Sequence, residues 1–304
     1  MYHSAPHLQE FYARMAKTVE KITSDYEIVF VNDGSPDDSL NTALSIREKD
    51  NKVKIIDLSR NFEHHKAMMT GLSFSKGDLV FLIDCDLEEE PEWLGLFYKQ
   101  FLNEENCDVI YGQQKKRKGS LYEQMTGAIF YIFFNSLSNF KIPHNLTTAR
   151  LMTRRYVDSL LKFTERELFL AGVWQITGYR QVPMKVVKLS RGKSTYTFSR
   201  KTEILINSVV NFSDRPLRFI FYSGLVITLF AFLYIIYIVI ARLFLGQGIE
   251  GWTSLIASVW LLGGIIISFL GIIGIYISNI YVETKNRPYT IVRAVYGIEQ
   301  DAVK

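Results

Sequence analysis

Short apolar runs alternate with amphipathic stretches over the first half of the chain. An apolar run closed by turn-forming residues predicts a buried strand, and the longer periodic stretches predict helices. The predicted strands are Glu27–Val31, Val53–Leu58, Leu79–Ile83 and Val109–Tyr111. The predicted helices are Asp37–Glu48, Glu63–Phe74 and Pro91–Asn103. This alternation predicts an α/β domain with a mainly parallel sheet covered by helices.

Two much longer apolar runs lie in the last third of the chain. Phe219–Ile240 and Ser254–Ile280 carry no charged residue, and their lengths of about 22 and about 27 residues exceed the ~20 that a helix needs to cross a bilayer. A Gly-rich connection, Gly246–Gly251, joins them. The pattern predicts a hairpin of two membrane-spanning helices. The alternative, two buried core helices of a soluble protein, fits these lengths poorly.

Positive residues flank both outer ends of this hairpin. Arg215 and Arg218 precede the first run, and Lys285 and Arg287 follow the second. Positive residues mark the cytoplasmic side of a membrane, so both ends are expected to face the cytoplasm. The basic, amphipathic stretch Lys201–Phe212 predicts a helix in the membrane interface, or alternatively a helix packed on its own domain.

The chain is therefore expected to consist of four consecutive parts. Residues 1–200 form a cytoplasmic α/β domain, and residues 201–216 form the interface helix. Residues 217–283 contain the two transmembrane helices, at about 219–241 and about 254–280. Residues 284–304 form a cytoplasmic tail.

Composition narrows the class of protein. Of 304 residues, 48% are hydrophobic and 22% are charged, which is too apolar for a disordered chain. The net charge of +4 is too small for a dedicated nucleic-acid binder. Two cysteines give no disulfide framework, which agrees with a reducing cytosolic setting. The first 20 residues lack the apolar core of a signal peptide.

Two acids follow the third predicted strand and are separated by one residue. Asp84 and Asp86 come directly after Leu79–Ile83, at the end of the strand where ligands of open α/β sheets collect. Alternate residues of an extended chain point the same way, and Mg²⁺ takes one or two carboxylates together with substrate phosphates. The pair predicts a metal site for a phosphorylated substrate. The alternative is a solvated acidic turn before a helix that opens at Pro91.

Three neighbouring features add to this candidate site. Asp33 ends the first predicted strand and is expected to line the same crevice as the acid pair. Cys85 is expected to be a small buried side chain that points away from the acids. The basic run Lys115–Lys118 follows the fourth strand and is either a solvated loop or a contact for an anion.

With these motifs in order, the chain resembles the membrane-anchored family-two glycosyltransferases of GT-A type that load a sugar onto a polyprenyl phosphate. Dolichol-phosphate mannose synthase and bacterial undecaprenyl-phosphate glycosyltransferases are of this kind. The resemblance covers nearly the whole chain. The segments that carry it are Asn32–Ser35, Leu58–Phe62, Asp84–Leu87 with Pro91–Glu92, Ala149–Met152, Gly192–Tyr196, Arg215–Leu217 and Arg287–Pro288.

The resemblance implies roles for residues at the donor end of the site. Asp33 and Arg60 would hold the base and ribose of a nucleotide sugar. Asp84 would lie near the ribose and the metal, and Asp86 would be the main ligand of Mg²⁺ or Mn²⁺.

It also implies an acceptor end. Arg150 would pair with the lipid phosphate, because its planar guanidinium can bind phosphate oxygens in a bidentate way. Arg117 and Lys193 are further candidates for the acceptor phosphate. Asp86 and Arg150 are thus the expected catalytic residues.

The sequence departs from the family pattern in two places. The family begins with an apolar strand, and here Met1–Ser4 aligns with the end of that motif, so the first strand is missing and two strand edges are expected to lie open. Thr148 and Asn145 stand where many relatives have aspartates, one of them a candidate base. A phosphate monoester has a second pKa near 6 and is largely dianionic at neutral pH, so alignment matters more than a base. His144 is either a base or a polar loop residue.

The sequence thus predicts metal-dependent, inverting transfer from a nucleotide sugar, expected to be a UDP-sugar, to a polyprenyl phosphate, expected to be undecaprenyl phosphate. The enzyme would lie in a bacterial inner membrane with its catalytic domain and both termini in the cytoplasm. By family analogy it would form a homo-oligomer, as a tetramer, and it would bind no nucleic acid. Two alternatives remain: a glycosyltransferase that extends a glycan, and a catalytically degenerate anchor or partner subunit.

Overall fold

The computed structural model describes residues 1–114, 142–166, 169–189, 213, 215–245 and 251–298. These residues fall into two compact units. The first unit holds the described residues up to 189 together with 287–298, and the second holds those from 213 to 286. The predicted basic loop Lys115–Lys118 and interface helix Lys201–Phe212 lie outside the described residues.

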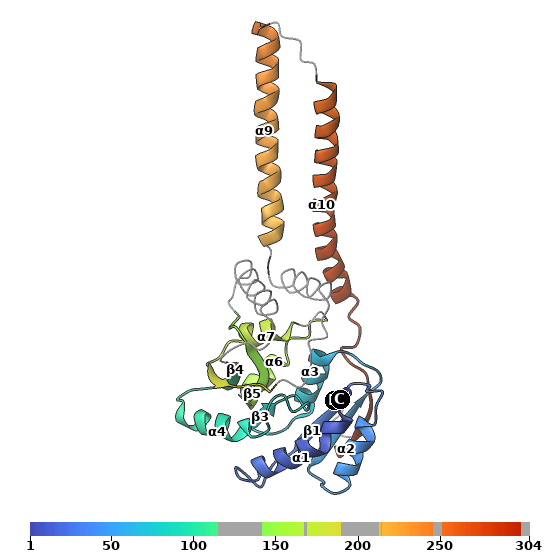
Figure 1. Ribbon diagram of the computed structural model, residues 1–304, viewed down its shortest axis with the longest axis vertical. Coiled ribbons are helices and arrows are strands. Elements are labelled where there is room, and N and C mark those ends of the chain that lie inside the picture. Colours follow the sequence, from blue (N-terminus) through green and yellow to red (C-terminus); the bar gives the residue numbers. More distant parts are fainter. Residues whose placement is uncertain (115–141, 167–168, 190–212, 214, 246–250, 299–304) are drawn as a thin grey trace. The chain divides into compact units, whose positions relative to one another are not determined.

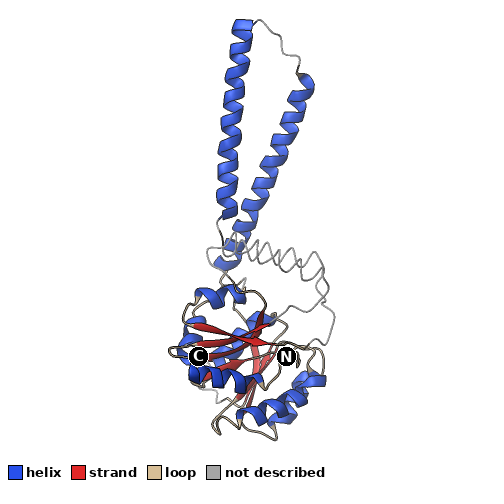
Figure 2. Cartoon of the chain, turned by 60° about the vertical axis from the view of Figure 1, so that its left-hand side comes forward, coloured by secondary structure: helices blue, strands red, loops and turns tan. Residues whose placement is uncertain are grey.

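The first unit is built of alternating strands and helices (Figures 1 and 2). In chain order its described elements are α1 (Ala5–Val19), β1 (Ile28–Asn32), α2 (Ser39–Arg47), β2 (Val53–Leu58), α3 (His64–Phe74), β3 (Leu79–Leu82), α4 (Trp93–Asn103), β4 (Val109–Gln114), β5 (Leu146–Thr153), α6 (Arg154–Leu160), α7 (Leu170–Ile176), β6 (Gln181–Val186) and β7 (Val292–Tyr296). Every predicted strand and helix of this unit is present, with ends that differ by a few residues. The predicted α/β class is confirmed.

The strands form two mixed sheets rather than one mainly parallel sheet. Their orders are β1-β2-β7 and β3-β5-β4-β6. Among the described residues, β1 with β2 and β4 with β6 are parallel, while the other three pairs are antiparallel. The prediction of a mainly parallel sheet was wrong in this respect. Strand direction was not visible in the sequence, because strands buried on both faces have similar apolar runs in either direction.

The N-terminus lies beside the carboxyl end of β1. The amine of Met1 donates to the carbonyl of Val31, and the amide of Asp33 donates to the carbonyl of Met1 at 3.0 Å. In the described part of the chain, β1 pairs with β2 alone and β3 pairs with β5 alone. Among the described residues, β1 and β3 are therefore edge strands of their sheets.

The last strand fixes the ends of the first two. The guanidinium of Arg293, on β7, lies 3.6 Å from the carboxylate of Asp57 and donates to the carbonyl of Ser59 at 2.5 Å. The other oxygen of Asp57 accepts from the side chain of Asn32 at 2.8 Å. Residues after the long helices thus return to hold the strand ends of the first unit.

One apolar cluster joins the two sheets. Leu8 of α1, Phe97 of α4, Ile55 of β2 and Ile110 of β4 are all fully buried members of it. The buried positions of α1 follow helical spacing, since Leu8, Phe11 and Met15 share one face. Because side chains of both sheets enter this cluster, the strand ends that carry the candidate acids are held by a common core.

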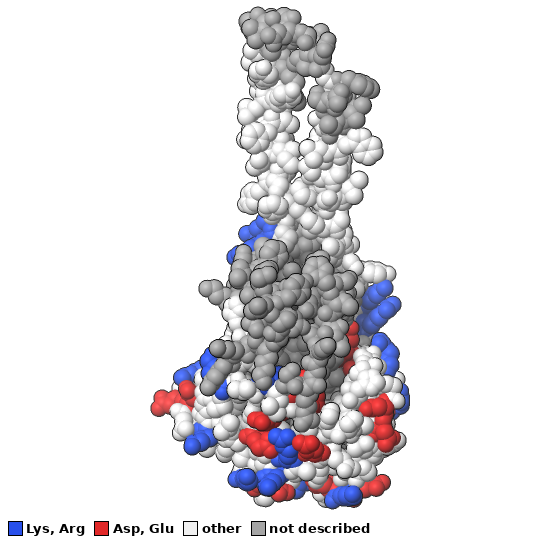
Figure 3. All heavy atoms as spheres, viewed as in Figure 1, with Lys and Arg blue, Asp and Glu red and all other residues white. Residues whose placement is uncertain are grey.

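The second unit consists of two long helices, α9 (Arg215–Leu245) and α10 (Trp252–Thr284). Their segments Arg215–Tyr234 and Ser258–Thr284 have mean hydropathies of 1.8 and 2.3, and none of either segment is buried. Figure 3 shows a described surface without charge along most of this unit. By length and composition, both helices are long and apolar enough to cross a membrane, so the predicted pair of apolar helices is confirmed.

Candidate active site

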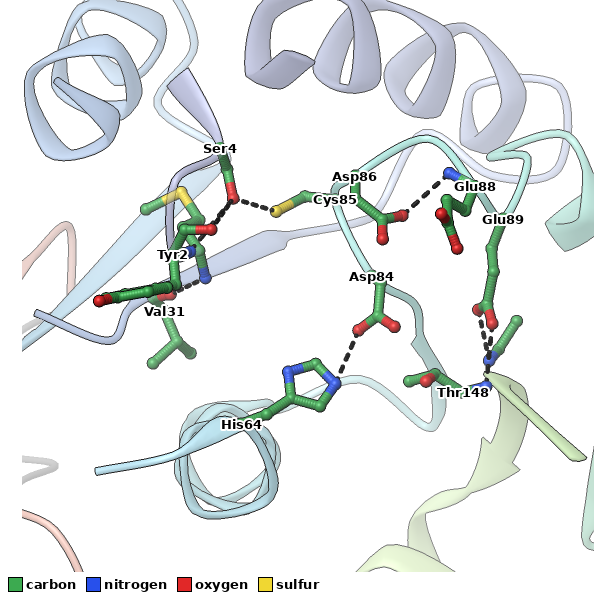
Figure 4. A network of polar contacts seen from close by, with 12 residues as sticks. Tyr2, Ser4, Val31, His64, Asp84, Cys85, Asp86, Glu88, Glu89 and Thr148 are labelled. Atoms are coloured by element: carbon green, nitrogen blue, oxygen red, sulfur yellow. Dashed lines mark hydrogen bonds and ion pairs between the residues drawn. The ribbon is translucent and has the colours of Figure 1, made fainter. Parts of the chain in front are cut away.

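The candidate site is formed by the loops that follow β1, β2 and β3. Asp33 follows β1, Arg60 lies just after β2, and Asp84 and Asp86 follow β3. His64, the first residue of α3, reaches across from the β2 side to Asp84. His64 therefore connects the β2 side of the site to the acidic loop after β3 (Figure 4).

The loops after β1 and β2 pack directly on each other. The carboxylate of Asp33 accepts from the amide of Phe62 at 2.7 Å, and the Asp33 side chain is buried. Gly34 has a φ of +59°, and a Cβ there would lie 2.4 Å from the carbonyl carbon of Arg60. Arg60 itself is exposed and stacks its guanidinium 4.1 Å from the ring centroid of Phe62. The sequence therefore needs glycine at this position, because any side chain would push the two loops apart.

Asp84 is held in its charged form by its neighbours. Its Oδ1 lies 3.2 Å from Nε2 of His64, and the side chain of Thr148 on β5 also lowers the pKa of this carboxylate. Burial alone would raise the pKa of Asp84, but the hydrogen bond and charge of His64 outweigh it and lower that pKa. An ionised carboxylate at this position suits a metal or a ribose hydroxyl.

Asp86 lies in a different environment two residues on. Its Oδ1 accepts from the amide of Glu88 at 2.9 Å. Burial, together with the negative charge of Asp84, raises the pKa of Asp86. Because β3 ends at Leu82, the two acids lie in a turn, and the turn rather than strand alternation brings their charges close.

Asp84 and Asp86 fit a divalent ion whose remaining ligands come from a substrate. Among the described residues, no three His, Cys, Asp or Glu side chains converge as a complete metal-binding set. Mg²⁺ needs no such set, because one or two carboxylates and substrate phosphates suffice. The like charges of Asp84 and Asp86 repel each other, and a cation bound between the two carboxylates would relieve this repulsion.

Cys85 points out of this site. Its sulfur lies 3.3 Å from the hydroxyl of Ser4, and the side chain packs against the core. Figure 4 shows its side chain turned toward Ser4, so the predicted direction is confirmed, but Cys85 is half-buried rather than buried.

A buried carboxylate connects the acidic turn to β5. Glu89 is fully buried, and its two oxygens accept from the amides of Thr148 and Ala149 at 3.0 and 2.8 Å. Lys188, just after β6, places its ammonium 3.6 Å from Glu89 and 3.2 Å from Glu88. Burial and the charge of Asp84 raise the pKa of Glu89 to about 7.

Arg150 is a buried cation on β5. It is 1% exposed, and its guanidinium lies 3.0 Å from the ring centroid of Trp174 on α7. Its Nε donates to the carbonyl of Thr148 at 3.4 Å. Burial lowers the pKa of Arg150 to about 10. No carboxylate lies within ion-pair distance of it in the part of the chain that the structure describes.

Several contacts of the site had no signal in the sequence. His64 and Trp174 belong to segments that look like ordinary helices, and Lys188 follows a strand that was not predicted. Glu89 was part of an acidic turn that fits a helix start equally well. The predicted acceptor residues Arg117 and Lys193 lie outside the described residues.

A comparison with family models decides the class of this protein. The model of glycosyl transferase family 2 matches residues 1–161, which include every described site loop up to β5. The chain is a family 2 glycosyltransferase.

Known relatives of this glycosyltransferase extend over almost all of it. A Mycobacterium tuberculosis protein named as a glycosyltransferase is 48% identical over 297 residues, covering 98% of this chain and 86% of the relative. The prophage bactoprenol glucosyl transferase homolog of Escherichia coli is 30% identical over 289 residues, covering 94% of each chain. Among solved structures, the mannosyltransferase PcManGT from Pyrobaculum calidifontis, in complex with GDP-Man and Mn²⁺, is 15% identical, with a TM-score of 0.48 over 93% of this chain and 82% of that one.

Proposed function

We propose that this glycosyltransferase moves a sugar from a nucleotide sugar, a UDP-sugar, to a polyprenyl phosphate at the cytoplasmic face of a bacterial membrane. Two relatives named as bactoprenol glucosyl transferases, about 30% identical to this chain, support a polyprenyl acceptor. The single observation in the structure that carries the proposal is the buried guanidinium of Arg150, which no carboxylate of the described residues pairs. A buried charge without a counter-ion is costly, and an anionic acceptor headgroup would supply that counter-ion.

The nucleotide is assigned to the loops after β1 and β2. Asp33 and Arg60 lie on two loops that Gly34 allows to touch. Asp33 fixes the main chain at Phe62, and Arg60 presents an exposed cation next to an aromatic ring. A base and ribose would be held by this pair of loops.

The divalent ion, Mg²⁺ or Mn²⁺, is assigned to Asp86, with Asp84 assisting. Bound there, it would neutralise charge on the departing nucleoside diphosphate. The protein's own contribution is to keep Asp84 ionised through His64 and to hold the turn in place through the amide of Glu88.

The acceptor phosphate is assigned to Arg150, with Arg117 and Lys193 as further candidates. A bidentate contact would orient the phosphate, whose oxygen attacks the anomeric carbon while the bond to the diphosphate breaks. A single displacement of this kind inverts the anomeric centre. The acceptor is largely dianionic at neutral pH, so Thr148 and Asn145 can stand where relatives carry acids.

Attachment to the membrane is assigned to α9 and α10. Their apolar lengths and the positive residues on their outer flanks support a hairpin with both ends in the cytoplasm. Such an anchor keeps the enzyme where the lipid headgroup lies. Assembly as a tetramer is part of this proposal, by analogy with the family.

The test is transfer of radiolabelled glucose from UDP-glucose to purified undecaprenyl phosphate by the full chain in detergent. We expect a labelled lipid that depends on Mn²⁺ or Mg²⁺ and disappears with a chelator. Undecaprenol without its phosphate serves as the control acceptor, and a panel of UDP- and GDP-sugars covers the donor. Equal labelling of undecaprenol, or no lipid product with any donor, would contradict the proposal.

Replacing Gly34 with alanine should weaken nucleotide binding about tenfold or more. The new Cβ would meet Arg60 at 2.4 Å and Asn61 at 2.5 Å, and alanine at a positive φ is strained by about 1–3 kcal/mol. Gly95→Ala is the matched control, because a Cβ there meets nothing within 4 Å and sits in α4. Calorimetric titration with UDP measures both. Unchanged binding in G34A would remove these loops from the nucleotide site.

A further inference from the structure

Lys188 places its positive charge against the acidic turn after β3. It follows β6, far along the chain from the turn, and its side chain is 23% exposed. Its ammonium contacts both Glu88 and Glu89. The next residue, Leu189, donates its amide to the carbonyl of Glu88 at 2.8 Å. Side chain and main chain therefore bind the same two residues of the turn.

Glu89 extends this connection to a third segment. Its carboxylate is fully buried and spans the adjacent amides of Thr148 and Ala149. The side chain of Thr148 also acts on Asp84, whose pKa it lowers, and Arg150 follows two residues later on β5. The Lys188–Glu89 pair thus lies between the acids assigned to the metal and the strand assigned to the acceptor.

We propose that Lys188 and Glu89 act as a clasp that positions the Asp84–Asp86 turn against β5, which makes both of them positioning residues for metal-dependent sugar transfer. This inference rests on the proposed function, because it needs the metal at Asp84 and Asp86. Neither residue is assigned a contact with substrate.

The alternatives for Lys188 make different predictions. A surface ion pair contributes little, and Arg180–Glu104, at the other end of β6, is such a pair, with side chains 53% and 29% exposed. Glu89 is different because it is 0% exposed. Removing one partner of a buried pair leaves an uncompensated charge, which is far more disruptive than losing both partners.

Lys188 could instead act only through its positive charge. The effect of its removal on Mn²⁺ binding distinguishes the two roles, because they predict changes in opposite directions. A cation beside two carboxylates opposes a second cation. If Lys188 acted through its charge alone, its removal would tighten Mn²⁺ binding. If it acts as a clasp, its removal lets the turn move away from β5, and Mn²⁺ binds more weakly.

The test uses the full chain in detergent with UDP-glucose and a Mn²⁺ titration followed by calorimetry. We expect Lys188→Met to raise the half-saturating Mn²⁺ concentration about tenfold, and Lys188→Arg to stay within about threefold of wild type, since it keeps the cation. The double variant Lys188→Met with Glu89→Gln should lie closer to wild type than Lys188→Met alone. Arg180→Met is the matched control and should change nothing.

A second measurement follows the contact itself. Amide hydrogen exchange at Thr148 and Ala149 should speed up in Lys188→Met and remain unchanged in Arg180→Met. Unchanged or tighter Mn²⁺ binding in Lys188→Met, or unchanged exchange at these amides, would overturn the clasp while the proposed function stands. If UDP-glucose binding to the wild-type protein does not depend on Mn²⁺, both the proposed function and the positioning role are contradicted.

Discussion

Asp86→Ala is expected to lower sugar transfer by about 1,000-fold while the chain stays folded and membrane-inserted. In the proposed function, the metal held by Asp86 would neutralise charge on the departing nucleoside diphosphate. A bound metal contributes several kcal/mol of stabilisation to such charge, and each ~1.4 kcal/mol corresponds to a factor of ten in rate. Labelled lipid product per unit time, at saturating UDP-glucose and undecaprenyl phosphate, measures the loss.

Stability should change far less than activity in this variant. Among the described residues, the Asp86 carboxylate accepts one hydrogen bond, from the amide of Glu88 in its own turn, and losing one such bond costs about 1 kcal/mol. Asp158→Asn is a suitable control, because Asp158 is an exposed acid paired with Arg154. Near-normal turnover in D86A, or an equal loss in D158N, would rule out Asp86 as the metal ligand.

The sequence located the acids of the site because local rules apply to them. Apolar runs ending in acids placed Asp33, Asp84 and Asp86 at strand ends, and the structure puts each of them there. These positions depend on strand length and turn chemistry, which neighbouring residues determine. The long apolar helices were predictable for the same reason, since length and composition alone define them.

The features that the sequence did not predict depend on contacts between distant segments. β7 pairs with β2 after more than half of the chain has intervened, and no local pattern announces such a pairing. Lys188 resembles any lysine after a strand until Glu89 is placed beside it. The helix α1 was missed because its many polar residues concealed a buried face of Leu8, Phe11 and Met15.

The direction of the strands illustrates the same limit. β5 is buried along most of its length, so its pattern agrees with a parallel or an antiparallel neighbour. Its actual neighbours, β3 and β4, both run antiparallel to it. This arrangement places Thr148 beside Asp84 and aligns Arg150 with Leu82 and Tyr111. The geometry that brings the Asp84–Asp86 turn next to β5 therefore arises from tertiary pairing.

Arg150→Met is expected to reduce transfer about 100-fold without lowering thermal stability. Arg150 is buried against Trp174, so its charge is a cost to the fold that methionine would remove. The cation–π contact and the hydrogen bond to the carbonyl of Thr148 oppose this gain, at about 1–2 kcal/mol each. Loss of a bidentate contact with a phosphate, at about 3 kcal/mol, accounts for the loss of activity.

The kinetics should assign this loss to the acceptor. Calorimetric binding of UDP-glucose should be unchanged in R150M, while the rate per enzyme at limiting undecaprenyl phosphate falls. Arg150→Lys keeps the charge without the planar fork and should recover part of the rate. Arg180→Met, at an exposed arginine, should match wild type. A fall in thermal stability with unchanged turnover per folded molecule would make Arg150 a structural residue. Arg150 would then be a residue that lowers the stability of the fold but is required for the reaction. Such residues are common in binding sites, where function and stability impose opposite demands.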